Sequence, residues 1–210
     1  MLPYALVTIV ATAALLAAER AGWQPGVWIA KPIAAAGFVG AAWANGALDT
    51  PYGTWILVGL VLSLVGDVLL IPKEQPRVFL AGLGAFLLGH VAYTIAFAVR
   101  GLEPQTVAVA LVAVLGLGLL ALRWLLPHVN QSMRRPVLAY VAVISGMLVC
   151  AAGTVGAAGM PAIFGGAFAF YLSDLAVARQ RFVRKSFSNK AWGLPLYFGA
   201  QLVLAWTVGA

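Results

Sequence analysis

Long apolar segments, separated by short polar connectors, repeat along the whole chain of 210 residues. A helix needs about 20 apolar residues to cross the hydrocarbon core of a bilayer, or about 17 if it stands upright. The sequence predicts eight such helices, at residues 3–18, 27–44, 53–71, 77–99, 106–126, 136–153, 160–178 and 191–210. The expected fold class is therefore all-α, a polytopic membrane protein in which residues 1–210 form a single integral membrane domain.

The composition supports this interpretation. The chain is 63% hydrophobic and 9% charged, with a mean hydropathy of +0.97, whereas soluble domains are roughly half apolar and a quarter charged. Cys150 is the only cysteine, which excludes an intramolecular disulfide and a cysteine metal cluster. The charges of the N-terminal segment follow its apolar run, the reverse of a secretory signal peptide, so we expect this segment to remain as the first helix.

Basic residues are distributed unequally between the two sets of connectors. If the helices alternate in direction, one side carries eleven of the 13 lysines and arginines, the other side carries Arg100, and Lys31 lies within a helix. The eleven are Arg20, Lys73, Arg77, Arg123, Arg134, Arg135, Arg179, Arg181, Arg184, Lys185 and Lys190. The positive-inside rule then places both termini outside the cytoplasm, and a seven-helix count would scatter the asymmetry.

The same asymmetry gives the net charge of +7 a topological meaning, so no nucleic-acid partner is expected. The partner implied by the composition is the lipid bilayer. The bias toward Ala, Val and Gly is compatible with a bacterial inner (plasma) membrane. The sequence gives no indication of the oligomeric state.

Three ionisable residues are expected at one depth in the cytoplasmic half of the membrane: Lys31, Asp67 and Asp174. Each lies four residues, about 6 Å, inside the predicted end of its helix. Charges at membrane depth are costly and mark candidate functional sites. One alternative is a structural pair in which Lys31 neutralises one aspartate, although one lysine cannot neutralise both. Two carboxyls in unequal surroundings can act as general acid and general base, so Asp67 and Asp174 are the predicted catalytic residues.

Other polar side chains share helix faces with small or aromatic residues. His90 and Tyr93 follow Gly82 and Phe86 on one face of the fourth helix, and Ser173 is a predicted hydrogen-bond partner for a carboxyl. The predicted substrate-binding residues are Lys31, His90, Tyr93, Tyr140, Ser173, Tyr197 and Gln201. The second histidine, His128, lies in a connector and no H-E-x-x-H motif is present, so no metal site is predicted.

The two halves of the sequence also resemble each other weakly. The third and fourth helices with their basic connector correspond to the seventh and eighth, with 107 residues between Asp67 and Asp174. His90 then aligns with Tyr197. Parallel repeats occur in membrane folds, and a coincidence is the alternative.

Several motifs in one order resemble the YhhN-like family, which includes animal transmembrane protein 86. They run from about Lys31 to Gln201 of this chain. The motifs are Lys31-Pro32, Gly66-Asp67-x-x-Leu70, Gly82-x-x-x-Phe86-x-x-x-His90-x-x-Tyr93, Phe170-x-x-Ser173-Asp174 and Pro195-x-Tyr197-x-x-Ala200-Gln201.

The resemblance implies a lysoplasmalogenase, a hydrolase that cleaves the vinyl ether bond of lysoplasmalogen to a fatty aldehyde and a glycerophospho-base. Asp67 and Asp174 match the two acidic positions of the family. Protonation of the vinyl ether gives an oxocarbenium ion to which water adds, so no cofactor is expected. The lipid phosphate is expected at Lys31 or at the basic connectors, and Tyr, His and Gln side chains are expected to orient water and the glycerol hydroxyl.

Two other classes of protein also use aspartates within the membrane. A proton-coupled transporter would use the carboxyls as a relay. An intramembrane aspartyl protease would carry Gly-x-Gly-Asp, Tyr-Asp and Pro-Ala-Leu motifs, but this chain has Leu64-Val65-Gly66-Asp67, Leu172-Ser173-Asp174 and Pro195-Leu196-Tyr197. Enzymatic hydrolysis is the preferred prediction, with transport as the alternative.

Overall fold

The computed structural model describes residues 1–72 and 75–210, which form long α-helices and no strand. The helices are α1 Leu2–Ala21, α2 Gln24–Trp43, α3 Pro51–Leu69, α4 Pro76–Arg100, α5 Pro104–Leu125, α6 Gln131–Ala158, α7 Pro161–Ala178 and α8 Phe187–Trp206. All eight of these helices in the described part of the chain are long and apolar enough to cross a membrane, which confirms the all-α prediction. Lys73, one of the basic connector residues, lies outside the described residues.

Two helices begin four or more residues earlier than the hydropathy pattern predicts. The α6 helix begins at Gln131 and passes through Pro136, and α8 begins at Phe187 behind an N-cap serine, Ser186. The predicted starts were residues 136 and 191. Hydropathy marks only the part of a helix that lies in the hydrocarbon, whereas backbone hydrogen bonds extend a helix through polar residues. The oxygen of Ser186 accepts a hydrogen bond from the Ser188 amide, so the cap explains the earlier start of α8.

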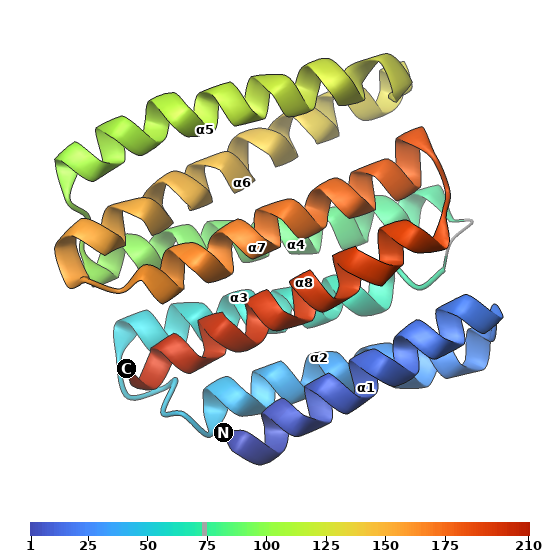
Figure 1. Cartoon of the computed structure of the whole chain (residues 1–210), viewed down its shortest axis with the longest axis horizontal. Helices are drawn as coiled ribbons and strands as arrows, with labels where there is room; N and C mark the ends of the chain where they lie inside the picture. Colours follow the sequence, from blue (N-terminus) through green and yellow to red (C-terminus); the bar gives the residue numbers. More distant parts are fainter. Residues whose placement is uncertain (73–74) are drawn as a thin grey trace.

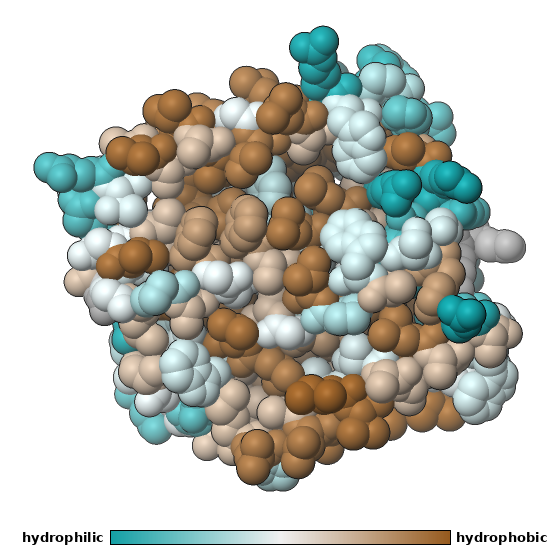
Figure 2. Space-filling view, viewed as in Figure 1, coloured by the Kyte–Doolittle hydropathy of each residue, from teal (hydrophilic) through white to brown (hydrophobic). Residues whose placement is uncertain are grey.

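The helices pack side by side in one bundle, and both chain termini lie at the same end of it (Figure 1). Helices that follow one another pack as antiparallel neighbours, α1 on α2, α3 on α4, α5 on α6 and α7 on α8. Contacts between the two halves of the chain come mainly from α4 on α6 and from α8 on both α1 and α2. Figure 2 shows that apolar side chains cover the middle of one face and that hydrophilic side chains gather toward its ends. This distribution fits a bundle that spans a bilayer.

Glycines bring α3 and α4 close together beside the site described below. A Cβ at Gly66 would lie 2.6 Å from the Phe86 ring, and a Cβ at Gly59 would clash with the Tyr93 ring. Small residues at such points let two membrane helices approach closely. The predicted face of α4, with Gly82, Phe86, His90 and Tyr93, is buried. The packing therefore fixes the position of His90 relative to α3 and α7.

Candidate active site

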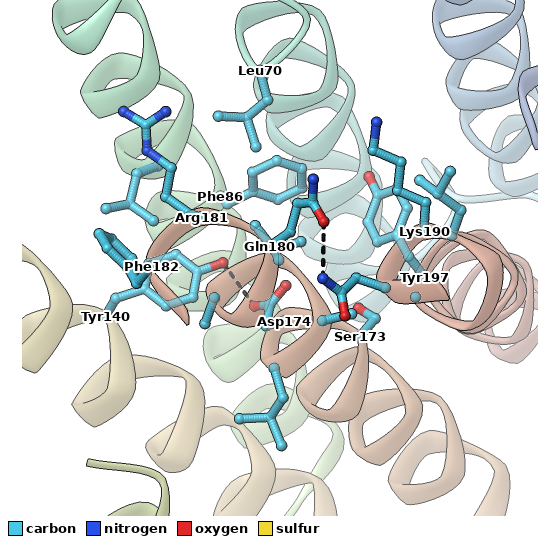
Figure 3. A pocket seen from close by; sticks show the side chains of 18 of the residues that line it. Leu70, Phe86, Tyr140, Ser173, Asp174, Gln180, Arg181, Phe182, Lys190 and Tyr197 are labelled. Carbon is cyan, nitrogen blue, oxygen red and sulfur yellow. Dashed lines mark hydrogen bonds between the residues drawn. The ribbon is translucent and has the colours of Figure 1, made fainter. Parts of the chain in front are cut away.

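A cavity of about 310 Å³ lies at the end of the bundle where α7 is joined to α8. Side chains from all eight helices line it, and both Asp67 and Asp174 belong to its wall. Figure 3 shows Asp174 and Tyr140 on one side of this cavity, with Gln180, Arg181 and Lys190 also around it. The two aspartates that the sequence singled out therefore share one cavity.

Asp67 lies near the C-terminus of α3 and is 2% exposed. The Lys31 ammonium from α2 lies 3.1 Å from Asp67 Oδ1 and donates a hydrogen bond of 2.9 Å to the Asp67 carbonyl. This carbonyl is available because the last four carbonyls of a helix have no partner within it. The Tyr197 hydroxyl from α8 donates to Asp67 Oδ2 at 2.6 Å. Every polar group on this carboxyl is a donor, an arrangement that stabilises the carboxylate.

Asp174 has different surroundings and is 17% exposed. The Tyr140 hydroxyl from α6 donates to Asp174 Oδ2 at 2.8 Å. His90 Nε2 lies 3.7 Å from the same oxygen, which is too long for a hydrogen bond. Among the residues that the structure describes, no lysine or arginine forms a salt bridge with Asp174. Within the described residues, Asp67 is thus paired with a lysine and Asp174 is not.

Aromatic rings pack beside the two carboxyls; Phe86, Tyr140 and Tyr197 line the cavity, whereas Phe170 and His90 do not. The Tyr197 ring packs on Phe170 at 5.3 Å and on Phe86 at 5.8 Å between ring centroids. The His90 ring lies 4.6 Å from Phe170 and 5.3 Å from Tyr140. Packing of this kind excludes water and strengthens the electrostatic interactions of the polar groups that remain.

Three of the predicted substrate-binding residues make their hydrogen bonds elsewhere. Ser173 lines the cavity, but its hydroxyl donates to the Phe170 carbonyl at 2.7 Å rather than to a carboxyl. A serine inside a helix often bonds to its own preceding turn, and the sequence alone did not show which partner it would take. The Tyr93 hydroxyl donates to Gln201 Oε1 at 2.7 Å, and both side chains are fully buried outside the cavity lining.

The mouth of the cavity is polar and basic. Arg181 lies over the Phe79 ring at 4.2 Å, Lys190 forms an ion pair with Glu19, and Lys185 is exposed on the same rim. These positively charged side chains lie on the connector between α7 and α8 or at the start of α8. They give the entrance the charge that an anionic group requires.

Two amide side chains hold this connector in place. Asn189, 1% exposed, donates to Gln180 Oε1 at 2.8 Å and to the Arg184 carbonyl at 2.7 Å. Its own oxygen accepts from Arg179 at 3.0 Å. Sequence reasoning missed Gln180, Asn189 and Glu19, because it considered only the basic residues of the connectors. The signal was Asn189, a polar residue just behind the N-cap serine of α8.

A second part of the cavity wall is apolar. It is formed by Leu83 of α4, Ala121 and Leu125 of α5, and Val137 and Ile144 of α6. In Figure 1, α5 lies at the outer edge of the bundle, and many of its apolar side chains are exposed. The cavity therefore joins a charged mouth, two carboxyls and an apolar region.

Comparison with protein families gives one match, to the YhhN family, over residues 26–208. Both aspartates and all the predicted substrate-binding residues lie within this range. No solved structure matches the chain significantly.

Curated relatives of the chain carry one activity in their names. The chain is 34% identical over 152 residues to lysoplasmalogenase TMEM86B of Mus musculus, a match that covers 72% of this chain and 62% of the relative. It is 32% identical over 164 residues to lysoplasmalogenase TMEM86A of Bos taurus, with 75% and 66% covered. It is 33% identical over 166 residues to a lysoplasmalogenase of Mycobacterium tuberculosis, with 74% and 60% covered. The chain thus spans less than two thirds of the length of these relatives.

Proposed function

This chain belongs to the YhhN family, and from that membership we propose that it is a lysoplasmalogenase, which hydrolyses the vinyl ether bond of a lysophospholipid within the membrane. The observation that carries the proposal is the pair of carboxyls in one cavity, one paired with Lys31 and the other not. Acid-catalysed cleavage of a vinyl ether needs a proton donor and a separate carboxylate that stabilises the cation. The names of the relatives point to the same reaction.

The contacts assign the two roles in this proposal. Asp67, held as a carboxylate by Lys31 and Tyr197, is the base, and Asp174 is the acid. Asp174 protonates the vinyl carbon farther from the ether oxygen, and the Asp67 carboxylate stabilises the resulting oxocarbenium ion. Asp67 then takes a proton from the attacking water. As the hemiacetal collapses, Asp67 protonates the glycerol oxygen and the hemiacetal hydroxyl returns a proton to Asp174, so both carboxyls regain their starting states.

The cavity also suggests how the lipid lies. Its phosphate faces the basic mouth at Arg181, Lys185 and Lys190, and its alkyl chain follows the apolar wall beside Leu83 and Ala121. The vinyl ether, which joins these two parts of the molecule, then lies beside the carboxyls. Lys31 contacts Asp67 twice, so we assign it to the carboxylate and assign the phosphate to the rim.

The purified protein in detergent is expected to release fatty aldehyde from lysolipids that contain the vinyl ether. Matched lysolipids with an alkyl ether or an ester at the same position should give none, because neither forms an oxocarbenium ion on protonation of a carbon–carbon double bond. Aldehyde is measured directly by mass spectrometry. Uptake of a lysolipid into liposomes without any product would favour the transporter alternative and contradict the proposal.

The charge asymmetry leads us to propose that both termini face away from the cytoplasm, in a bacterial inner membrane, with the cavity mouth on the cytoplasmic side. In a Cys150→Ser background, Lys185→Cys and Gln105→Cys place single exposed thiols near opposite ends of the bundle. An impermeant maleimide added to intact cells should label only the Gln105→Cys variant. Labelling of Lys185→Cys alone would reverse the orientation.

A further inference from the structure

The site is built from equivalent positions in the two halves of the chain. Helices α1 to α4 correspond to α5 to α8, and the 107 residues between Asp67 and Asp174 also separate His90 from Tyr197. Lys31 and Tyr140 occupy the second helix of each half, 109 residues apart. In each half the fourth helix contacts the second helix of the other half, because α4 contacts α6 and α8 contacts α2. This shared contact is what a parallel repeat of the two halves would produce.

Each carboxyl has one neighbouring polar side chain from its own half of the chain and one from the other half. Asp67 is contacted by Lys31 of its own half and by Tyr197 from α8 of the other half. Asp174 is contacted by Tyr140 of its own half and faces His90 from α4 of the other half. His90 and Tyr197 thus occupy equivalent positions beside Asp174 and Asp67. The surroundings of the two carboxyls differ because one position holds a histidine and the other a tyrosine.

Tyr197 presents a hydrogen-bond donor to its carboxyl, whereas His90 presents a hydrogen-bond acceptor. Tyr197 donates a hydrogen bond to Asp67. In His90, Nδ1 lies 2.7 Å from the Phe86 carbonyl, which can only accept, so Nδ1 carries the hydrogen. Nε2 of the neutral ring then presents a lone pair toward Asp174 Oδ2, 3.7 Å away. This nitrogen is buried, and no hydrogen-bond partner satisfies it.

We propose that His90 is a positioning residue that keeps the proton on Asp174, with its Nε2 lone pair as the acceptor for the carboxylic acid O–H. A carboxylate facing this lone pair would be repelled, whereas a protonated carboxyl is attracted. The 3.7 Å separation closes to hydrogen-bond length by rotation of the carboxyl, because catalytic hydrogen bonds often tighten only in the substrate complex. The inference rests on the acid role proposed above for Asp174.

Infrared spectroscopy of the purified protein at neutral pH, without substrate, tests this directly. The carbonyl stretch of a protonated carboxyl should be present in the wild type and in Asp67→Asn, and absent from Asp174→Asn. It should be lost in His90→Phe and retained in His90→Gln, whose amide oxygen still accepts a hydrogen bond. Aldehyde release should fall about 10²-fold or more in His90→Phe, the lower end of the range for general acid catalysis. A band that is unchanged in His90→Phe would overturn the role of His90.

A second measurement needs no change at His90. The chain has only two histidines, so ¹⁵N-labelled histidine in a His128→Gln variant gives the NMR signals of His90 alone. We expect a neutral ring with the hydrogen on Nδ1, and an imidazolium would contradict the proposal. Because neither spectrum depends on turnover, the expected spectra without aldehyde production would refute only the proposed function. Aldehyde production with an unprotonated Asp174 would refute this inference and the acid role of Asp174, but not the hydrolase activity.

Discussion

Replacing either aspartate with asparagine is expected to reduce aldehyde release by about 10²–10⁴-fold, the range typical of a lost general acid or base. Asparagine keeps the shape of the side chain but can neither deliver the proton of Asp174 nor accept one as Asp67 does. The loss should appear in kcat as well as in kcat/KM, because both carboxyls act on the reacting atoms rather than on the phosphate or the alkyl chain. Initial rates of aldehyde formation with a vinyl ether lysolipid provide the measurement.

Asp49→Asn is the matched control for these two variants. Asp49 is exposed in the connector between α2 and α3, outside the cavity lining, so the same chemical change there should leave the rate unaltered. Elution as a single species from a sizing column would show that the variants remain folded. Turnover near the wild-type rate in both Asp67→Asn and Asp174→Asn would refute the acid–base mechanism.

The number of helices was predictable because a membrane span requires a long apolar segment, and this chain has eight of them. The positions at which α6 and α8 begin were not predictable, since polar residues such as Gln131 and Ser188 belong to a helix without raising its hydropathy. Hydrogen bonds and caps decide where these helices begin, and they are only partly visible in a hydropathy pattern.

The sequence predicted which residues form the candidate site but not which of them contact one another. The cost of burying a charge identified Asp67, Asp174 and Lys31 from the sequence. The sequence left open which aspartate Lys31 contacts, because either partner satisfies the same depth and charge. The choice of Asp67 depends on the packing of α2 on α3. The approach of His90 to Asp174 depends on the ring contact of His90 with Phe170 of α7 and on the packing of α4 on α6. Such contacts between distant segments are set by side-chain packing, which a single sequence does not encode in a local pattern.

The pair of Lys31 and Asp67 has a measurable consequence for stability. Lys31→Met is expected to lower the free energy of unfolding by ~3–5 kcal/mol, because it leaves the Asp67 carboxylate buried without its cation. The cost is high at this position since Asp67 is 2% exposed and a single water does not replace the charge of the ammonium. Unfolding in detergent, followed by tryptophan fluorescence, measures the change. Lys185→Met removes the same charge from an exposed position, so its effect should remain within about 0.5 kcal/mol.

The double variant Lys31→Met/Asp67→Asn separates the contribution of the pair to stability from its contribution to catalysis. With both charges removed, no unpaired ion remains in the protein interior, so most of the lost stability should return. Aldehyde release should not return, because the base is still missing. A double variant as unstable as Lys31→Met alone would mean that Lys31 acts through the packing of its alkyl chain. Recovery of stability without recovery of activity would identify Asp67 as a carboxylate that the fold keeps ionised for the reaction, with Lys31 as its counter-ion.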